Sequence, residues 1–139
     1  MSETVGSVMT RRPVTLPAAA PVVEAARAMR EADIGDVIVL EHDRIAGILT
    51  DRDIVVRGLA EGRDLRHTSI GDICSRVLTT VSDDSSVEDA IKLMREKAVR
   101  RLPVVAGDQP IGVVSLGDLA LKRDRLSALG DISAASPNH

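Results

Sequence analysis

The chain has 139 residues, of which 44% are hydrophobic and 28% charged, and it contains no Phe, Tyr or Trp. Its 18 basic and 21 acidic residues leave a net charge of -3, so the chain as a whole does not attract a polyanion, and it has no rings on which single-stranded nucleic acid could stack. The length favours one compact domain whose core consists of Val, Ile, Leu, Ala and Met.

Cysteine content and hydropathy indicate the cellular compartment. Cys74 is the only cysteine, so no intrachain disulfide can form, and its neighbours Ile73 and Ser75 favour a small buried hydrophobe over a nucleophile. No apolar run approaches the ~20 residues of a membrane span, and residues 1–4 do not resemble a signal sequence. We therefore expect a cytoplasmic, soluble protein that has neither a membrane nor a nucleic acid as partner.

In chain order, an extended segment ending at Thr15 precedes a helix that begins near Pro21. Two short apolar runs follow, residues 37–40 and 45–49, and they predict a hairpin of buried strands. A second helix is expected from about Asp51. The first helix carries an apolar stripe of Val22, Ala25, Ala26, Met29 and Ala32, and the second is expected to turn Ile54, Val55 and Leu59 inward.

Residues 61–68 form a polar connector, after which the same elements recur. An extended segment ends at Thr80, and Ser86 with Asp89 predicts a capped helix start. Residues 102–105 and 111–114 predict a second hairpin, followed by a helix from about Leu116. The expected buried side chains of the two helices are Val87, Ala90, Ile91, Met94 and Ala98, then Leu119, Ala120 and Leu126.

The recurrence is a tandem duplication. The tripeptide at residues 29–31 is repeated at residues 94–96, an offset of 65, and the same offset pairs Gly47 with Gly112. The register holds over about fifty residues without a gap. We assign residues 1–62 to the first repeat, residues 63–126 to the second and residues 127–139 to a flexible polar tail. The expected fold class is α+β, with β-α-β-β-α repeats related by a pseudo-twofold axis, each a three-stranded sheet flanked by helices.

Two segments resemble the signature of cystathionine-β-synthase (CBS) domains. Residues 47–53 (GILTDRD) and 112–118 (GVVSLGD) both follow its pattern of Gly, two apolar residues, Thr or Ser, two variable residues and Asp. Residues 99–105 (VRRLPVV) are similar to the family's other marker, a basic stretch before an apolar-Pro-Val strand. The resemblance covers about residues 4–126 and implies a stand-alone tandem pair, called a Bateman module. Such pairs typically bind adenine nucleotides or related adenosyl ligands in clefts between the repeats, so the resemblance implies a ligand of this kind.

The chemistry of the motif suits such a ligand. An Asp three residues after the strand-ending Thr or Ser lies in the first turn of a helix, where one carboxylate accepts both hydroxyls of a ribose. Backbone N–H groups at the same helix start suit a phosphate, and aliphatic strand edges hold the base without aromatic rings. The candidate ligand-binding residues are Asp118, Ser115, Arg100, Arg101, Pro103, Val104, Thr80, Asp53, Thr50, Ile38 and Thr15.

Most of these candidates also have a purely structural explanation. An Asp in the first turn offsets the helix dipole by ~0.3–1 kcal/mol, and a Thr or Ser before it caps the helix. Paired arginines are commonly a solvated face, and a Thr in a strand is commonly there for its β-branched side chain. These alternatives apply to Asp53 and Asp118, to Thr50 and Ser115, to Arg100 and Arg101, and to Thr15 and Thr80.

The repeats differ where a phosphate would lie. Residues 35–36 are Gly-Asp where the second repeat has Arg100-Arg101, and Asp51 stands opposite Leu116. Acidic groups disfavour a highly charged ligand, so we expect the Asp118 site to be the better nucleotide site.

No catalytic constellation is present in the sequence, because His42, His67 and His139 lie far apart and no nucleophile–base pair can be named. We expect a non-enzymatic, homodimeric ligand-sensing module that requires no cofactor. Its ligand is an adenine nucleotide or an S-adenosylmethionine-like molecule, and it acts on an unidentified protein target. The alternative is a protein-interaction adaptor of the same fold with no working nucleotide site.

Overall fold

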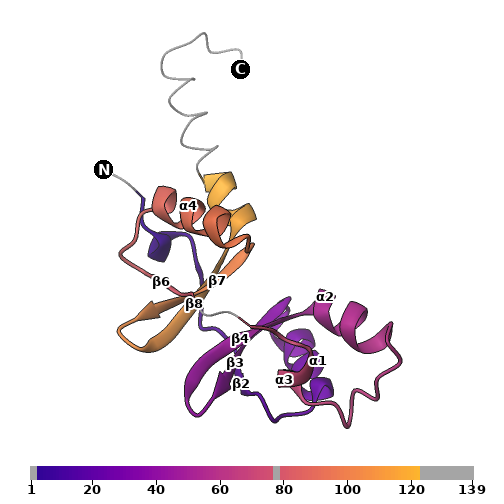
Figure 1. Ribbon diagram of the computed structural model, residues 1–139. Coiled ribbons are helices and arrows are strands. Elements are labelled where there is room, and N and C mark those ends of the chain that lie inside the picture. The colour runs from indigo at the N-terminus through magenta and orange to yellow at the C-terminus, as the bar shows by residue number, and fades with distance from the viewer. Residues whose placement is uncertain (1–2, 77–78, 123–139) are drawn as a thin grey trace. The chain divides into compact units, whose positions relative to one another are not determined.

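The computed structural model describes residues 3–76 and 79–122, which form two compact units (Figure 1). The first unit is residues 12–79, and the second unit combines residues 1–11 with residues 80–139. Each unit therefore contains the hairpin of one repeat and a short arm from the other repeat. We call residues 4–11 the N-terminal arm and residues 69–76 the middle arm.

The first unit is a four-stranded sheet with helices packed against it. The strand order is β2-β3-β4-β5, with β2 parallel to β3 and the other neighbours antiparallel. Its elements are β2 (Thr15–Pro17), α1 (Val22–Ala32), β3 (Asp36–Glu41), β4 (Arg44–Thr50), α2 (Asp51–Asp53), the π-helix η2 (Ile54–Leu59), α3 (Ile70–Ile73) and β5 (Ser75–Arg76).

The second unit repeats this topology with strand order β1-β8-β7-β6. Its elements are the 3-10 helix η1 (Val5–Ser7), β1 (Thr10–Arg11), β6 (Val81–Ser82), α4 (Val87–Lys97), β7 (Arg101–Ala106) and β8 (Gln109–Ser115). A further helix follows β8 and is described over residues 116–122.

The two arms dock by the same hydrogen bonds. In the second unit, Val5 N donates to Ser85 O at 2.7 Å and Gly6 N donates to Asp83 O at 3.0 Å. In the first unit, the corresponding bonds join Ile70 N to Ala20 O and Gly71 N to Ala18 O, at 2.8 and 2.9 Å. Each arm ends in a two-residue strand that pairs antiparallel with the second hairpin strand, β1 on β8 and β5 on β4. The repeats therefore exchange equivalent segments.

Glycines at equivalent positions make this docking sterically feasible. A Cβ on Gly47 would lie 2.3 Å from Ser75 O, and a Cβ on Gly112 would lie 2.7 Å from Thr10 O. Both contacts are closer than a side-chain carbon tolerates, so only glycine lets the arm strand lie on the hairpin. The first residue of each CBS-like signature is thus explained by the arm.

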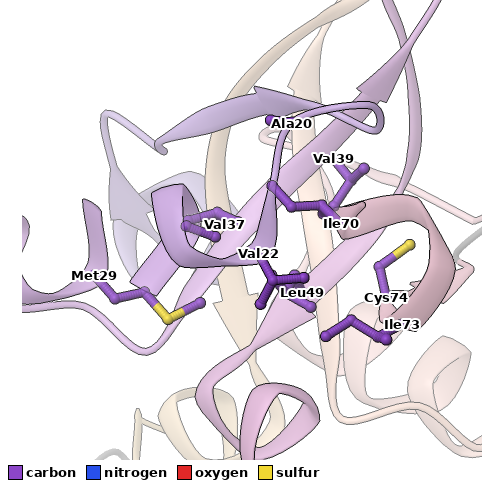
Figure 2. Packing of buried hydrophobic residues seen from close by; sticks show 10 residues of the cluster. Ala20, Val22, Met29, Val37, Val39, Leu49, Ile70, Ile73 and Cys74 are labelled. Atoms are coloured by element: carbon purple, nitrogen blue, oxygen red, sulfur yellow. The ribbon is translucent and has the colours of Figure 1, made fainter. Parts of the chain in front are cut away.

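The core of the first unit includes residues from the arm. Ile70 and Ile73 of α3 are 0% and 2% exposed and pack with Val22 of α1 and Leu49 of β4, as Figure 2 shows. Cys74 lies in the same cluster, as the sequence predicted for a small buried hydrophobe. Burying arm residues here stabilises the docked arm, because each large aliphatic side chain contributes about 1.5–3 kcal/mol when removed from water.

The fold class is confirmed, but three details of the prediction were wrong. Ala32 and Ala98, expected on the apolar stripes, are exposed, because Ala32 is the last residue of α1 and Ala98 is the C-cap that follows α4. Each sheet has four strands rather than three, because the arm supplies an extra strand at one edge. Val55 and Leu59 are 55% and 65% exposed rather than inward-facing, since residues 54–59 form a π-helix whose wider turn departs from the α-helical spacing assumed. The predicted Ser86 cap is confirmed, with Asp89 N donating to Ser86 Oγ at 3.1 Å. Leu126 and the tail at residues 127–139 lie outside the described residues.

Across residues 3–76 and 79–122, none of the helices combines the length and apolar character needed to cross a bilayer.

We predict that Gly47→Ala lowers the free energy of unfolding by about 1–3 kcal/mol, because the added methyl group overpacks the contact with Ser75 O. Urea denaturation followed by circular dichroism measures the change. Gly117→Ala is the matched control, since the nearest atom to its added Cβ is Ser115 Oγ at 3.9 Å. Equal stability of Gly47→Ala and the parent protein would contradict the steric explanation.

Candidate functional site

The candidate site of the first unit lies where β4 passes into α2. Thr50 ends the strand and caps the helix, because its Oγ1 accepts a hydrogen bond from Asp53 N at 3.1 Å. Asp53 returns the contact, with its Oδ2 accepting from Thr50 N at 3.0 Å. The two residues form a complete capping box, which holds the Asp53 carboxylate against the backbone.

Arg57 engages the other oxygen of that carboxylate. Its Nε lies 4.0 Å from Asp53 Oδ1, one helical turn away. Arg57 Nη1 also donates to the carbonyl oxygens of Ile73 and Cys74, at 3.4 and 3.5 Å. The Asp53 side chain is only 12% exposed. Each oxygen of this carboxylate therefore has a protein group beside it, a backbone donor at Oδ2 and a cation near Oδ1.

The equivalent position of the second unit is arranged differently. Ser115 ends β8 and accepts a hydrogen bond from Asp118 N at 3.1 Å, so the cap is present. Asp118 is exposed, and its carboxylate makes no hydrogen bond or ion pair with any residue that the structure describes. Lys122, one turn later, pairs instead with Glu3 of the N-terminal segment, with Nζ 3.8 Å from Glu3 Oε1.

The residues that open the preceding strands approach these helix starts. Asp51 N donates to Gly35 O at 3.0 Å, and Leu116 N donates to Arg100 O at 2.7 Å. Strand pairing sets Asp36 opposite Thr50 and Arg101 opposite Ser115. The first-unit edge therefore has more acidic than basic residues, and the second-unit edge the reverse. The charged residues are Asp36, Asp51, Asp53, Arg52 and Arg57 on the first, and Arg100, Arg101, Asp118 and Lys122 on the second.

The apolar candidates occupy different faces of their sheets. Ile38 and Pro103 hold equivalent strand positions, and both are buried. Val104 is 0% exposed and follows Pro103, so its side chain points to the opposite face, the one that Leu102 also uses. Its contact with a ligand stays a prediction.

The two threonines differ in exposure. Thr15 opens β2 opposite Ile38 and is partly buried, whereas Thr80 is exposed and directly precedes β6. Their roles as ligand contacts also stay predictions.

The sequence did not point to a hollow of about 410 Å³ in the first unit. It lies at the far end of β3 from Asp36 and Thr50, near the hairpin turn, so it is separate from the candidate site. Because its residues come from the hairpin turn, the β2–α1 loop and the middle arm, only the arm exchange brings them together. The lining consists of Pro17, Ala18, Ala19, Leu40, Glu41, His42, Ser69, Gly71, Asp72 and Arg76.

The Cys74 thiol and the His67–Asp64 pair do not form a further reactive site. Burial raises the pKa of the Cys74 thiol, which lowers the thiolate fraction and makes it a poor nucleophile. The hydrogen bond from His67 lowers the pKa of Asp64 on the exposed connector. Within the described part of the chain, no three His, Cys, Asp or Glu side chains gather in a way that could hold a metal ion.

A comparison with family models matches the CBS domain twice, at residues 5–59 and 70–124. The chain therefore belongs to the CBS domain family, as a tandem pair, and its resemblance to the family signature is confirmed. Pairs of this kind are regulatory modules in general.

Curated relatives support this assignment. The CBS domain-containing protein YhcV of Bacillus subtilis is 37% identical over 115 residues, which are 83% of this chain and 81% of the relative. Hypoxic response protein 1 of Mycobacterium tuberculosis is 38% identical over 97 residues, 69% of this chain and 68% of the relative.

Solved structures share the fold. The structure of Hypoxic Response Protein I with two coordinated zinc ions has a TM-score of 0.71 and 33% identity, covering 85% of this chain and 97% of that one. The hexameric CBS-CP12 protein of bloom-forming cyanobacteria has a TM-score of 0.81 and 27% identity, covering 91% of this chain and 75% of that one.

We predict that Asp53→Ala lowers the free energy of unfolding by about 1 kcal/mol more than Asp118→Ala. The first change removes a side-chain acceptor for Thr50 N and a partner of Arg57, whereas the second removes a carboxylate without such contacts. Urea denaturation of both variants and the parent measures the difference. Equal losses would show that the two carboxylates have the same structural role.

Proposed function

We propose that the protein is a non-enzymatic ligand-sensing module that binds an adenosine-containing nucleotide, AMP, ADP or ATP, through Asp118, Ser115 and the arginines at the start of β7. An S-adenosylmethionine-like molecule belongs to the same ligand class, and no cofactor is required. The observation that carries the proposal is the exposed Asp118 carboxylate in the first turn of a capped helix. A carboxylate with both oxygens available accepts two hydrogen bonds from the hydroxyls of a ribose.

The charges of the second unit support a ligand with phosphate groups. Arg100 and Arg101 stand at the strand end opposite Ser115, and the backbone N–H groups of the following helix start add partial positive charge. The first unit has Gly35 and Asp36 at the equivalent positions, with Asp51 beside them, and these acidic groups repel phosphate. The proposal therefore assigns the stronger site to the second unit.

Binding is coupled to regulation through the helix that begins at Leu116. A nucleotide held between Asp118 and the arginines stabilises whichever arrangement of these groups fits it best, and this shifts the population of conformations. The protein target that detects the shift is not identified by the chain's chemistry.

The test is isothermal titration calorimetry of the parent protein, Asp118→Ala and Asp53→Ala with AMP, ADP and ATP. We expect Asp118→Ala to weaken binding at least about tenfold, since a charged hydrogen bond contributes about 1.5–3 kcal/mol. Asp53→Ala is the control, with folding checked by circular dichroism. Equal weakening by both variants would contradict the preference for the second unit. Absence of binding by the parent protein would contradict the nucleotide proposal and favour the adaptor alternative.

We also propose that the protein is a homodimer. Helix η2 exposes the adjacent residues Val55 and Val56 and also Leu59, which are 55%, 47% and 65% exposed. Contiguous exposed aliphatic side chains favour a contact with another protein surface. The hexameric CBS-CP12 protein, which shares the fold, is a relative that self-associates.

Leu59→Glu is expected to convert the dimer to a monomer, because it buries a carboxylate in an apolar contact. Size-exclusion chromatography with light scattering at micromolar concentration measures the mass. Gln109→Glu is the control, since it adds the same charge at an exposed position, the first residue of β8. A monomeric parent protein would contradict the proposal.

A further inference from the structure

The two helices that carry the signature aspartates have a basic residue at the same place, one turn after the carboxylate. Arg57 follows Asp53 by four residues, and Lys122 follows Asp118 by four residues. At this spacing on a helix a cation reaches the carboxylate. The structure nevertheless pairs only Arg57 with its aspartate, and Lys122 is paired with Glu3.

From this difference we infer that the partner of the basic residue selects which aspartate is available to a ligand. Arg57 is a built-in competitor that covers Asp53, and Glu3 holds Lys122 away from Asp118. Glu3, Arg57 and Lys122 are positioning residues, since each acts through an aspartate. The inference rests on the proposed function, because it names the residues that direct the adenosine moiety to the second unit.

The contacts around Asp53 make the competition effective. Oδ2 already accepts a hydrogen bond from Thr50 N, and Arg57 Nε lies 4.0 Å from Oδ1, the oxygen that the backbone leaves unbonded. Arg57 is itself anchored by the carbonyl oxygens of Ile73 and Cys74 in the middle arm. A ribose hydroxyl must therefore displace a cation that the arm holds in place.

The contacts around Glu3 explain why Lys122 does not do the same. Ser7 Oγ lies 2.7 Å from both Glu3 Oε2 and Thr4 O and shares its proton between them, while Glu3 Oε1 lies 3.8 Å from Lys122 Nζ. The N-terminal segment is anchored beside this pair, because Val87 N donates to Glu3 O at 3.0 Å. The Glu3 carboxylate is thus held in place, and it competes with Asp118 for Lys122.

The first experiment uses adenosine, which lacks phosphate and isolates the sugar contact, and measures stoichiometry by calorimetry. We expect the parent protein to bind one adenosine, and Arg57→Gln to bind two, with Asp53→Asn in that background abolishing the second. Arg52→Gln is the matched control, because it makes the same change in charge on α2, which runs directly into η2, and this variant is expected to bind one. An Arg57→Gln variant that still binds one adenosine at unchanged affinity overturns the inference for the first unit.

The second experiment distinguishes two ways in which Glu3 could act. Glu3 could hold Lys122 away from Asp118, or it could only anchor the N-terminal arm. Glu3→Gln is expected to weaken adenosine binding about three- to tenfold, because Lys122 becomes free to cover Asp118. Lys122→Gln breaks the same ion pair but leaves no cation, so it is expected to bind like the parent protein, and the double variant is expected to recover parent affinity. Equal weakening of adenosine binding by Glu3→Gln and Lys122→Gln overturns the inference, since the ion pair would then affect binding only by stabilising the docked N-terminal arm.

A ligand-free measurement separates this inference from the proposed function. The Arg57 Nε–Hε resonance in a ¹H–¹⁵N spectrum is expected to shift in Asp53→Asn and to stay in place in Asp118→Asn. An unshifted resonance overturns the Arg57–Asp53 contact whatever the ligand. A shifted resonance without adenosine binding by the parent protein or by Arg57→Gln overturns the proposed function, and the selection of a ligand site with it.

Discussion

The contact between each arm strand and the glycine of the second hairpin strand is the constraint on which the rest of the molecule depends. Ser75 O and Thr10 O occupy the space that a Cβ on Gly47 or Gly112 would need. This approach lets β5 and β1 complete their sheets, and the helix of each arm docks on the same unit. The glycine of the CBS signature therefore has a structural reason in this chain, and the Thr or Ser and the Asp that follow it carry the candidate chemistry. In each unit one seven-residue segment, residues 47–53 or 112–118, therefore both allows the arm to dock and carries the candidate site.

The two copies of that segment have the same backbone and different electrostatics. Both Thr50 and Ser115 cap a helix by accepting from the N–H three residues later. The divergence begins at the residues around them, which are Asp36 and Asp51 in the first unit and Arg100 and Arg101 in the second. Duplication preserves backbone geometry because the hydrogen bonds of the strand and helix require it. Surface charges are free of that requirement, so they are where two copies of one unit acquire separate roles.

The sequence was sufficient to predict the elements of each repeat, since hairpins and caps depend on residues close together in the chain. Ser86 and Asp89 are an example, and the helix they begin is present. The exchange of arms could not be predicted from the sequence, for a physical reason. Val5 and Ile70 are equivalent residues, so either could dock on either repeat without changing any local pattern.

Geometry that depends on more distant contacts was also missed. The π-helix at residues 54–59 moved Val55 and Leu59 outward, against an α-helical spacing. The different partners of Arg57 and Lys122 depend on Cys74 and Glu3, which lie 17 and more than a hundred residues away. The charge difference between the sites, in contrast, was visible in the sequence at Gly35, Asp36 and Arg100.

The exchange also sets an order in which the protein can be completed during synthesis. The first unit is continuous in the chain, so it can close once the ribosome has released Arg76. The N-terminal arm is made before the first unit, whereas its docking strand β8, which ends at Ser115, is made after that unit. Val5 and Met9, both buried in the finished protein, must therefore wait in solvent while about a hundred residues are added. At about 5–20 residues per second this interval is on the order of ten seconds, during which the nascent chain exposes an apolar segment that chaperones recognise.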